Sequence, residues 1–269
     1  MRGTITALLI LVSMSAAIAG EIREFSIPTL EKLGNELSHR DEIAARASDA
    51  VLDSQPVARS LKLRGWISEL SKSGDKVHLI TQTPSGPVLA YTVTFRGGKP
   101  QVDDRRGEAL PASIALRYKA LNTASAAVDG KLYKEANYNF EILNDPDGSG
   151  FLIYALAATQ KKGEILTGGH YRVTVSADGT KAERVDLLTG LVRQSVPTGA
   201  KPRAIVSTQL TSTLPVETWI YTSHLYHLPV YLGARNRGPW RFWHVVNGKF
   251  YKFSDAEMAE IKKAQKEEK

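Results

Sequence analysis

The chain has 269 residues and a formal net charge of +7, from 35 Lys and Arg residues against 28 Asp and Glu residues. It contains no cysteine, which excludes disulfides, a thiol nucleophile, a cysteine-ligated zinc and a cysteine-linked lipid anchor. The basic surplus favours anionic neighbours such as phospholipid headgroups, acidic glycans or acidic proteins, and we expect no nucleic-acid partner and no cofactor.

The first residues have the pattern of an export signal. Arg2 precedes an apolar run over residues 5–19, which ends in the small-x-small peptidase site Ala17-Ile18-Ala19. The run is about 15 residues long, whereas a spanning helix needs roughly 20 apolar residues. We therefore expect residues 1–19 to be a signal peptide that is cleaved near Ala19. The mature protein would be periplasmic or secreted, with no transmembrane anchor.

Residues 20–130 predict an N-terminal lobe that mixes helix and strand. Apolar residues recur at helical spacing over residues 28–53, and Pro28 suits a first helical turn, so we expect one or two helices there. A second helix is expected over residues 111–128, after a charged loop over residues 97–110. Three β-rich runs separated by Ser, Gly and Pro turns lie between the helical segments, at residues 61–70, 77–83 and 88–96.

Residues 131–254 predict a β-rich C-terminal lobe. Asn247-Gly248 is a two-residue hairpin signal between the last two expected strands. Ser254 and Glu257 form a capping box, which predicts a polar C-terminal helix over residues 255–269. The expected strands of this lobe lie at residues 138–143, 151–158, 170–175, 181–188, 204–213, 216–223, 229–232, 241–246 and 249–253. Because helices and strands are segregated along the chain, the pattern predicts an α+β fold, mainly antiparallel β-sheet in two lobes with flanking helices.

Aromatic residues concentrate between Thr218 and Phe253, far above the chain average of 8%. They are Trp219, Tyr221, Tyr226, Tyr231, Trp240, Phe242, Trp243, Phe250, Tyr251 and Phe253. Aromatic rings give a large contact area at small entropic cost, and nearby arginines could contact acidic groups. The alternative is that these rings cover a core, because strands are enriched in aromatics. As candidate binding residues we select Trp219, Tyr221, Tyr226, Arg235, Arg237, Trp240, Arg241 and Trp243.

Several histidines lie close to Glu217 in the sequence or on neighbouring expected strands, as a zinc site would require. In a strand, however, His224 and His227 would point to opposite faces, so we expect no metal. Compact catalytic signatures such as Gly-x-Ser-x-Gly and His-Glu-x-x-His are missing. A hydrolase that uses Glu217, His224, His227 or His244 for acid-base chemistry remains an alternative.

The stretch Asp145-Pro146-Asp147-Gly148-Ser149-Gly150 has the alternating carboxylates and the glycine of an acidic calcium loop. The distal glutamate of such a loop is missing, and a proline stands between the carboxylates. Strands are expected on both sides, so we expect an ordinary hairpin turn.

The second lobe contains several short motifs, at Asp145 to Gly148, Phe151 to Ala158, Gly168 to Arg172, Ser176 to Gly179, Pro215 to Thr218, Leu228 to Tyr231 and Trp243 to Gly248. In these motifs the chain resembles a set of exported proteobacterial proteins with no assigned activity. The resemblance covers residues 138–253. It implies export and a shared fold, but no reaction and no site residues.

Together these observations favour an exported soluble protein that is non-catalytic. It would bind an envelope glycan, a lipid headgroup or another exported protein through an aromatic, basic C-terminal surface. Two alternatives stay open, an envelope hydrolase with a His/Glu site and a periplasmic inhibitor or immunity factor.

Overall fold

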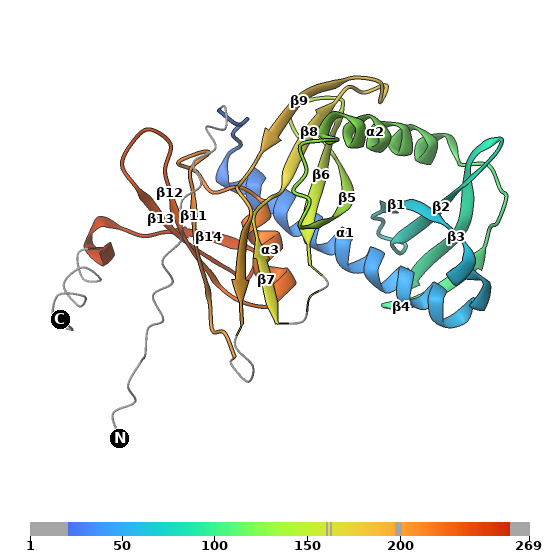
Figure 1. The fold of residues 1–269 in the computed structure, drawn as a ribbon, viewed down its shortest axis with the longest axis horizontal. Coiled ribbons are helices and arrows are strands. Elements are labelled where there is room, and N and C mark those ends of the chain that lie inside the picture. Colours follow the sequence, from blue (N-terminus) through green and yellow to red (C-terminus); the bar gives the residue numbers. More distant parts are fainter. Residues whose placement is uncertain (1–20, 160, 162, 197–200, 259–269) are drawn as a thin grey trace.

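The computed structural model describes residues 21–159, 161, 163–196 and 201–258, so the expected signal peptide, residues 1–19, lies outside the described residues. Over the described residues the chain forms helices α1 to α3, a short 3₁₀ helix η1 and four β-sheets (Figure 1). Strand pairing is antiparallel with one exception. The expected α+β class with mainly antiparallel sheet is confirmed. None of the helices described is long and apolar enough to cross a membrane.

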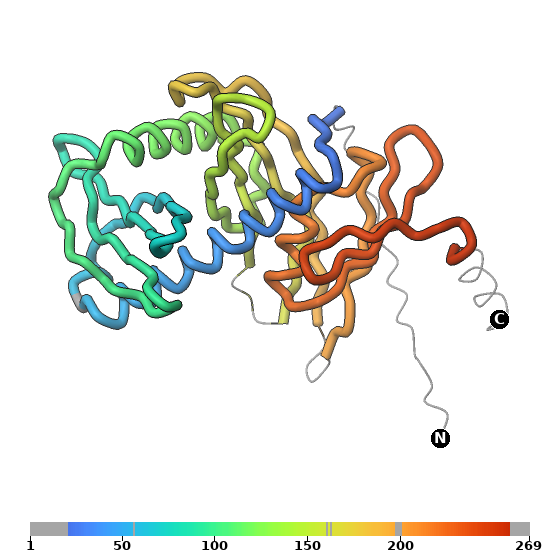
Figure 2. Tube along the Cα trace, turned by 180° about the vertical axis from the view of Figure 1, so that it is seen from behind, coloured from blue at the N-terminus to red at the C-terminus, as the bar shows by residue number. Residues whose placement is uncertain are grey.

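Helix α1 (Ile27–Ser54) is a single continuous helix that runs across the molecule (Figures 1 and 2). Its N-terminus is capped by Ser26, whose side chain accepts a hydrogen bond from the backbone N–H of Thr29. η1 (Pro56–Ser60) follows it directly. The expected helix over residues 28–53 is confirmed.

The first sheet is an antiparallel meander in the order β1-β2-β3-β4. Its strands are β1 (Leu63–Glu69), β2 (Lys76–Thr83), β3 (Gly86–Arg96) and β4 (Lys99–Asp104). The C-terminal half of α1 packs on it, with Ile43, Ala47 and Val51 buried against residues of β2 and β3. The strand β4 occupies part of the expected loop over residues 97–110.

The central sheet has the order β5-β6-β8-β9 and is covered on both faces. It comprises β5 (Asn137–Asn144), β6 (Phe151–Ala158), β8 (Tyr171–Val175) and β9 (Ala182–Leu187). One face packs on α2 (Ala112–Val128), and the other packs on α1 and α3 (Thr218–Tyr226). This double burial explains why β6 is apolar on both sides. Beside it, β7 (Glu164–Thr167) and β10 (Val192–Ser195) form a separate two-stranded ribbon.

The C-terminal sheet has the order β11-β12-β13-β14. Its strands are β11 (Ile205–Gln209), β12 (Val230–Ala234), β13 (Arg241–Val246) and β14 (Lys249–Lys252). The turn between β13 and β14 is the expected Asn247-Gly248 hairpin, and both residues have positive φ, as a type I′ turn requires. The capping box also forms, since Ser254 and Glu257 exchange side-chain to backbone hydrogen bonds. Of the expected helix over residues 255–269, residues 255–258 are described and are helical.

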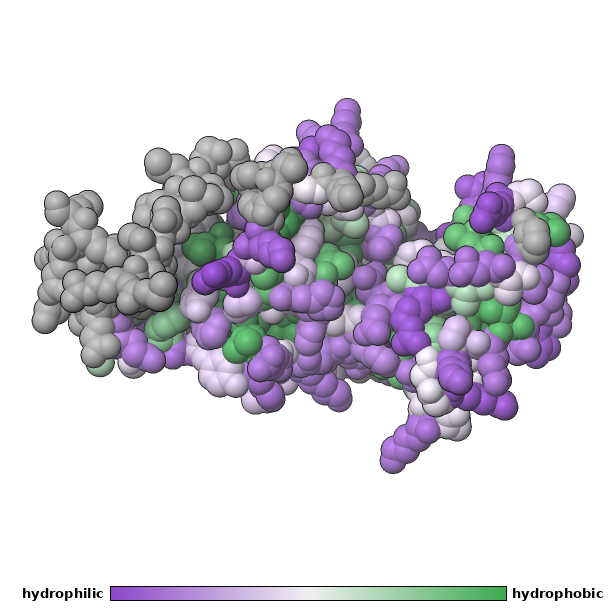
Figure 3. All heavy atoms as spheres, turned by 90° about the horizontal axis from the view of Figure 1, so that it is seen from below, coloured by the Kyte–Doolittle hydropathy of each residue, from purple (hydrophilic) through white to green (hydrophobic). Residues whose placement is uncertain are grey.

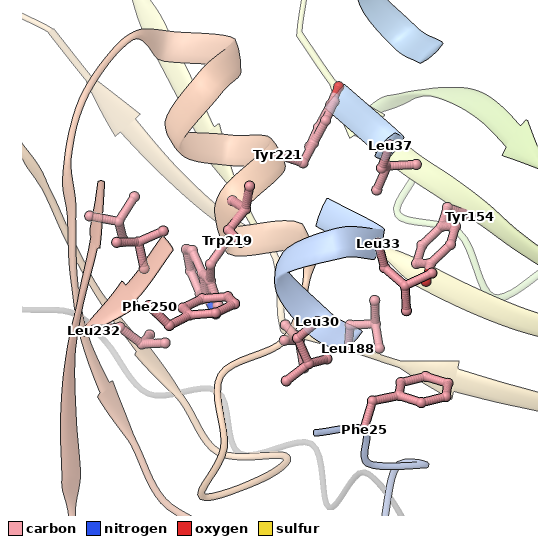
Figure 4. Packing of buried hydrophobic residues seen from close by; sticks show 14 of the residues in the cluster. Phe25, Leu30, Leu33, Leu37, Tyr154, Leu188, Trp219, Tyr221, Leu232 and Phe250 are labelled. Carbon is pink, nitrogen blue, oxygen red and sulfur yellow. The ribbon is translucent and has the colours of Figure 1, made fainter. Parts of the chain in front are cut away.

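The expected strand over residues 216–223 is wrong, because residues 218–223 belong to helix α3 and Glu217 is its N-cap. β11 and β12 pair in parallel, and a parallel pair needs a crossover connection, which α3 provides. Residues Thr218 to Ser223 are all buried, so no helical periodicity of polar and apolar residues marks this segment in the sequence. Figure 4 shows Trp219 pointing from α3 toward Phe250 and Leu232 of the C-terminal sheet.

Helix α1 links this part of the core to the rest. Gly34 allows α1 to approach α3 closely, since a Cβ atom at this position would lie 2.6 Å from the carbonyl oxygen of Glu217. Asn35 donates a hydrogen bond to the carbonyl of Gly248 in the last hairpin, at 2.9 Å. The inner face of the C-terminal sheet is therefore held against α1 and α3, which leaves its outer face for other contacts.

Candidate functional site

The two faces of the C-terminal sheet differ because side chains alternate along each strand. Leu232 of β12, Trp243 and Val245 of β13 and Phe250 of β14 point inward and are buried in the core shared with α1 and α3. The residues between them point outward. On β12 this outward position is held by Tyr231, which is 40% exposed.

A row of side chains crosses the outer face in register. Val206 pairs with Tyr231, Tyr231 with His244, and His244 with Tyr251, so the row spans all four strands. The rings of Tyr231 and His244 stack with centroids 4.6 Å apart and an angle of 5° between their planes. The Tyr251 ring lies 6.4 Å from His244, and the Phe253 ring lies 6.3 Å from Tyr231. These residues form a continuous aromatic strip with the exposed Val206 at its end.

A second group of rings lies beside this row and covers Gly233. The ring of Trp240 lies over Gly233, with ring carbons 3.3 Å from the place where a Cβ atom would be. Trp240 stacks at 6.4 Å on Phe242, and the guanidinium of Arg235 lies 5.7 Å from the centre of the Trp240 ring. A Cβ atom at position 233 would therefore press on the Trp240 ring, and glycine lets the ring lie close to the strand. We name the whole surface the aromatic face; it consists of Val206, Tyr231, Gly233, Trp240, Phe242, His244, Tyr251 and Phe253.

The segments that build the C-terminal sheet are strongly basic. Residues 201–210 and 230–253 contain seven Lys and Arg residues and no Asp or Glu. Because the whole chain has a surplus of seven basic residues, the rest of the chain is formally neutral. The seven cations are Lys201, Arg203, Arg235, Arg237, Arg241, Lys249 and Lys252. Lys249 pairs with Glu31 of α1 at 2.8 Å, and all seven are exposed.

Four of the eight candidate binding residues have structural roles instead. Trp219 is buried and donates a hydrogen bond from Nε1 to Gln209 Oε1 at 2.8 Å, and Tyr221 is buried with its hydroxyl 3.3 Å from Asp41. Tyr226 is half-buried and hydrogen-bonds to the backbone of β7. Trp243 is 6% exposed on the inner face of β13. These residues are not available on a binding surface, because α3 and the inner face of the sheet bury them.

The other four candidates lie at one end of the aromatic face. Arg235 and Arg237 follow β12, Arg241 begins β13, and Trp240 is part of the face itself. Arg237 has a φ of 49°, in the left-handed region, within the tight connection between the two strands. The candidate selection therefore gathered residues from the core and from the outer surface of the same sheet.

Sequence reasoning did not select five rings of the outer face. They are Tyr231, Phe242, His244, Tyr251 and Phe253. The sequence carries a signal for four of them, Tyr231, Phe242, His244 and Tyr251. Each of these alternates with an inward apolar residue along β12 to β14. Using this alternation to separate the two faces would have required the correct strand pairing.

The residues proposed for a hydrolase are not brought together. Glu217 is completely buried at the start of α3, His224 hydrogen-bonds to Asn35 on α1, and His244 lies in the aromatic face. His227 ends α3 in a left-handed conformation. In the part of the chain that the structure describes, no group of three His, Asp or Glu side chains could hold a metal ion.

Glu217 instead belongs to a buried ionic cluster centred on Arg172 of β8. Arg172 donates to Glu217 at 2.7 Å and to Asp186 of β9 at 2.9 Å, and the Tyr154 hydroxyl also donates to Glu217 at 2.7 Å. The three charged side chains are at most 3% exposed. Such a cluster fixes how β8, β9 and the start of α3 pack, since each charge has a partner in the core.

Residues Glu21 to Ser26 close this cluster from outside. The ring of Phe25 lies between two guanidinium groups, 4.7 Å from that of Arg23 and 4.8 Å from that of Arg172. Arg172 also donates to the carbonyl of Arg23, and Arg184 donates to the carbonyl of Glu21. The cluster is therefore sealed from solvent by the segment that directly follows the expected signal peptide.

The acidic turn considered for calcium holds an arginine. Arg23 donates two hydrogen bonds to Asp145, at 2.6 and 2.8 Å, and one to Asp147 at 3.1 Å. Burial raises the pKa of Asp145, but the hydrogen bonds from Arg23 and from the Asp147 backbone, together with the charges of Arg23 and Arg172, outweigh burial and leave this pKa below its ordinary value. The turn connects β5 and β6 as a hairpin, as expected, and its carboxylates are engaged by a cation of the chain itself.

A separate open cleft of about 480 Å³ lies at the other end of the molecule, between α1 and the turns of the first sheet. Three of its polar side chains, His39, Asp75 and Arg46, already have partners. His39 pairs with Asp75 at 2.7 Å, and Arg46 lies 5.0 Å from the centre of the Phe95 ring and donates to a backbone carbonyl. Lys72 and Arg96 also line the cleft, but its lining contains few aromatic rings, in contrast to the aromatic face.

No protein-family model, curated protein or solved structure matches this chain. The candidate site therefore depends on geometry and charge alone, and these single out the aromatic face.

Proposed function

We propose that this chain is an exported, non-catalytic binding protein that engages an anionic component of the cell envelope through the aromatic face. The observation that carries the proposal is the combination of seven Lys and Arg residues and no Asp or Glu in the segments of the C-terminal sheet with exposed rings on its outer face. A surface of one sign attracts ligands of the opposite sign and raises their rate of association.

The hydrolase alternative receives no support from the described residues. Acid-base catalysis needs groups within hydrogen-bond reach of one substrate position. Glu217 is buried in an ion pair with Arg172, whereas His244 stacks with Tyr231 on the outer surface. The periplasmic inhibitor alternative would use the same aromatic face, with an acidic exported protein as its partner.

The proposal is tested by co-sedimentation of the protein with isolated cell envelopes at increasing salt. The test variant is Arg235→Gln with Arg237→Gln, since both side chains are exposed at the border of the aromatic face and Arg235 lies against the Trp240 ring. The control variant is Lys62→Gln with Arg64→Gln, which removes the same charge from exposed positions at the start of the first sheet. We expect salt-sensitive binding that the test variant loses and the control variant keeps.

Equal binding by the two variants would show that the aromatic face is not the binding surface. Treating the envelopes with a protease separates the partner classes. Loss of binding after this treatment would indicate an acidic protein as the partner and would favour the inhibitor alternative.

A further inference from the structure

The aromatic face also exposes aliphatic side chains, which electrostatic attraction does not explain. Val206 of β11 is 66% exposed, and Leu210, directly after this strand, is 38% exposed. Ile205, Ser207 and Gln209 of the same strand are buried, so alternation places Val206 on the outer face beside Tyr231. Aliphatic groups gain free energy only when they leave water for an apolar environment.

The aromatic residues next to them suit the boundary between water and lipid. Tyr231 and Tyr251 are 40% and 54% exposed, and Trp240 is half-buried beside them. Tyrosine and tryptophan combine an apolar ring with a polar group, and for this reason they are enriched at the headgroup level of membranes.

Cations border the face at both ends of the sheet. Lys201 and Arg203 precede β11 at one end of the sheet, while Arg235 and Arg241 lie at the opposite end, where β12 ends and β13 begins. Arg237 lies in the loop between these two strands. Basic residues that border a surface with exposed apolar side chains match a layer of anionic headgroups above hydrocarbon.

From these observations we propose that the aromatic face docks on an anionic phospholipid bilayer, with Val206, Tyr231 and Tyr251 entering the headgroup region and the surrounding Lys and Arg residues contacting lipid phosphates. This inference rests on the proposed function and names the anionic partner. The protein would lie on the membrane surface as a peripheral protein.

A bilayer fits the face better than a glycan does. Sugar recognition needs polar groups that fix hydroxyls in place, in addition to rings. Residues 201–210 and 230–253 offer no carboxylate. Of their three side-chain amides, Gln209 is buried and bonded to Trp219, while Asn236 and Asn247 lie in the loops at the two ends of the sheet. The face extends over four strands and exposes Val206, and a surface of this extent matches a layer better than a single polymer strand.

The experiment measures partition of the protein onto vesicles of phosphatidylglycerol mixed with phosphatidylcholine, and onto vesicles of phosphatidylcholine alone. The protein is expressed from the full chain, and the N-terminus of the purified product is sequenced. A basic residue near an anionic bilayer raises partition by a factor of about five. We therefore expect Arg235→Gln with Arg237→Gln to lower partition about 25-fold, and Lys62→Gln with Arg64→Gln to leave it unchanged.

The apolar contribution is tested by a second pair of variants. Val206→Ser with Tyr251→Ser should lower partition about tenfold, because both side chains are expected to leave water on docking. Val57→Ser is the control, since Val57 is 52% exposed but lies in η1, away from the aromatic face. Circular dichroism of each variant checks that the fold is retained.

The failures of the two proposals are distinguishable. Binding to soluble polygalacturonate but not to anionic vesicles would overturn the bilayer and leave the proposed function standing. Binding to neither probe, nor to cell envelopes, would overturn both proposals. Equal vesicle partition of Val206→Ser with Tyr251→Ser and of the unmodified protein would also overturn the bilayer, because the exposed apolar side chains would then play no part.

Discussion

Glu141 of β5 is a carboxyl group that the fold keeps in the protein interior. It is 1% exposed, and its Oε1 atom accepts a hydrogen bond from Trp66 Nε1 at 2.6 Å. Burial raises the pKa of Glu141 from 4.5 to about 8; the charge of Asp41 adds to this effect, and the Trp66 hydrogen bond and the charge of Arg40 oppose it. The folded protein therefore holds Glu141 protonated at neutral pH.

This raised pKa makes stability depend on pH with a definite sign. In the unfolded chain Glu141 ionises above its ordinary pKa of 4.5, whereas in the folded protein it ionises only above about 8. Stability from this group is complete below the lower value and is lost as pH rises through the higher one. Each pH unit of this interval corresponds to about 1.4 kcal/mol, so the total loss is about 5 kcal/mol.

Glu141→Gln removes the titration and keeps an oxygen that can accept the Trp66 hydrogen bond. We expect the unfolding free energy of this variant, relative to the unmodified protein, to rise by about 4 kcal/mol between about pH 5 and about pH 9. Urea unfolding followed by circular dichroism at a series of pH values measures this difference. If the amide side chain itself changes the unfolding free energy, that change is the same at every pH and does not affect how the difference varies with pH.

Glu183→Gln is the control, because Glu183 is an exposed carboxylate on β9. Its stability difference from the unmodified protein should change little over the same range. If the difference for Glu141→Gln is also independent of pH, Glu141 is ionised and solvated in the folded protein, and the reasoning from burial is refuted.

Two further predictions concern the junction of α1, α3 and the buried ionic cluster. Gly34→Ala should lower the unfolding free energy by about 1–3 kcal/mol, because the added Cβ atom would meet the Glu217 carbonyl at 2.6 Å. This cost exceeds the gain from the better helix propensity of alanine. An unchanged or higher urea midpoint would contradict the close approach of α1 and α3. Glu217→Gln should cost about 3–5 kcal/mol, because it leaves the buried Arg172 without one of its two carboxylate partners. A melting temperature equal to that of the unmodified protein would show that the Arg172–Glu217 pair is not buried as described.

Local sequence signals predicted the elements whose structure depends on near neighbours. The periodic apolar residues of 28–53 form α1, and Asn247-Gly248 forms the last hairpin. The capping pair Ser254 and Glu257 also forms as expected. Each of these signals acts within a few residues, through a hydrogen bond, a turn conformation or one face of a helix, so it is readable without the rest of the chain.

The segment of residues 216–223 shows where such signals fail. It was expected as a strand, but residues 218–223 fold as part of α3, because β11 and β12 pair in parallel and need a crossover between them. The helix is buried from several sides, so its sequence carries no polar face that would mark its period. The short strands β7 and β10 were not predicted for a similar reason, because they form by pairing with each other and are far apart in the sequence.

By itself the sequence determined the fold class, the main helices and turns, and the concentration of aromatic and basic residues toward the C-terminus. It could not determine which of those aromatic rings face solvent. Trp243 and His244 are adjacent in the chain, yet one is in the core and the other is on the aromatic face. That division is made by α1 and α3, which cover the inner face of the C-terminal sheet and come from other parts of the chain. Only the tertiary structure decides it, because burial depends on contacts between residues that are distant in sequence.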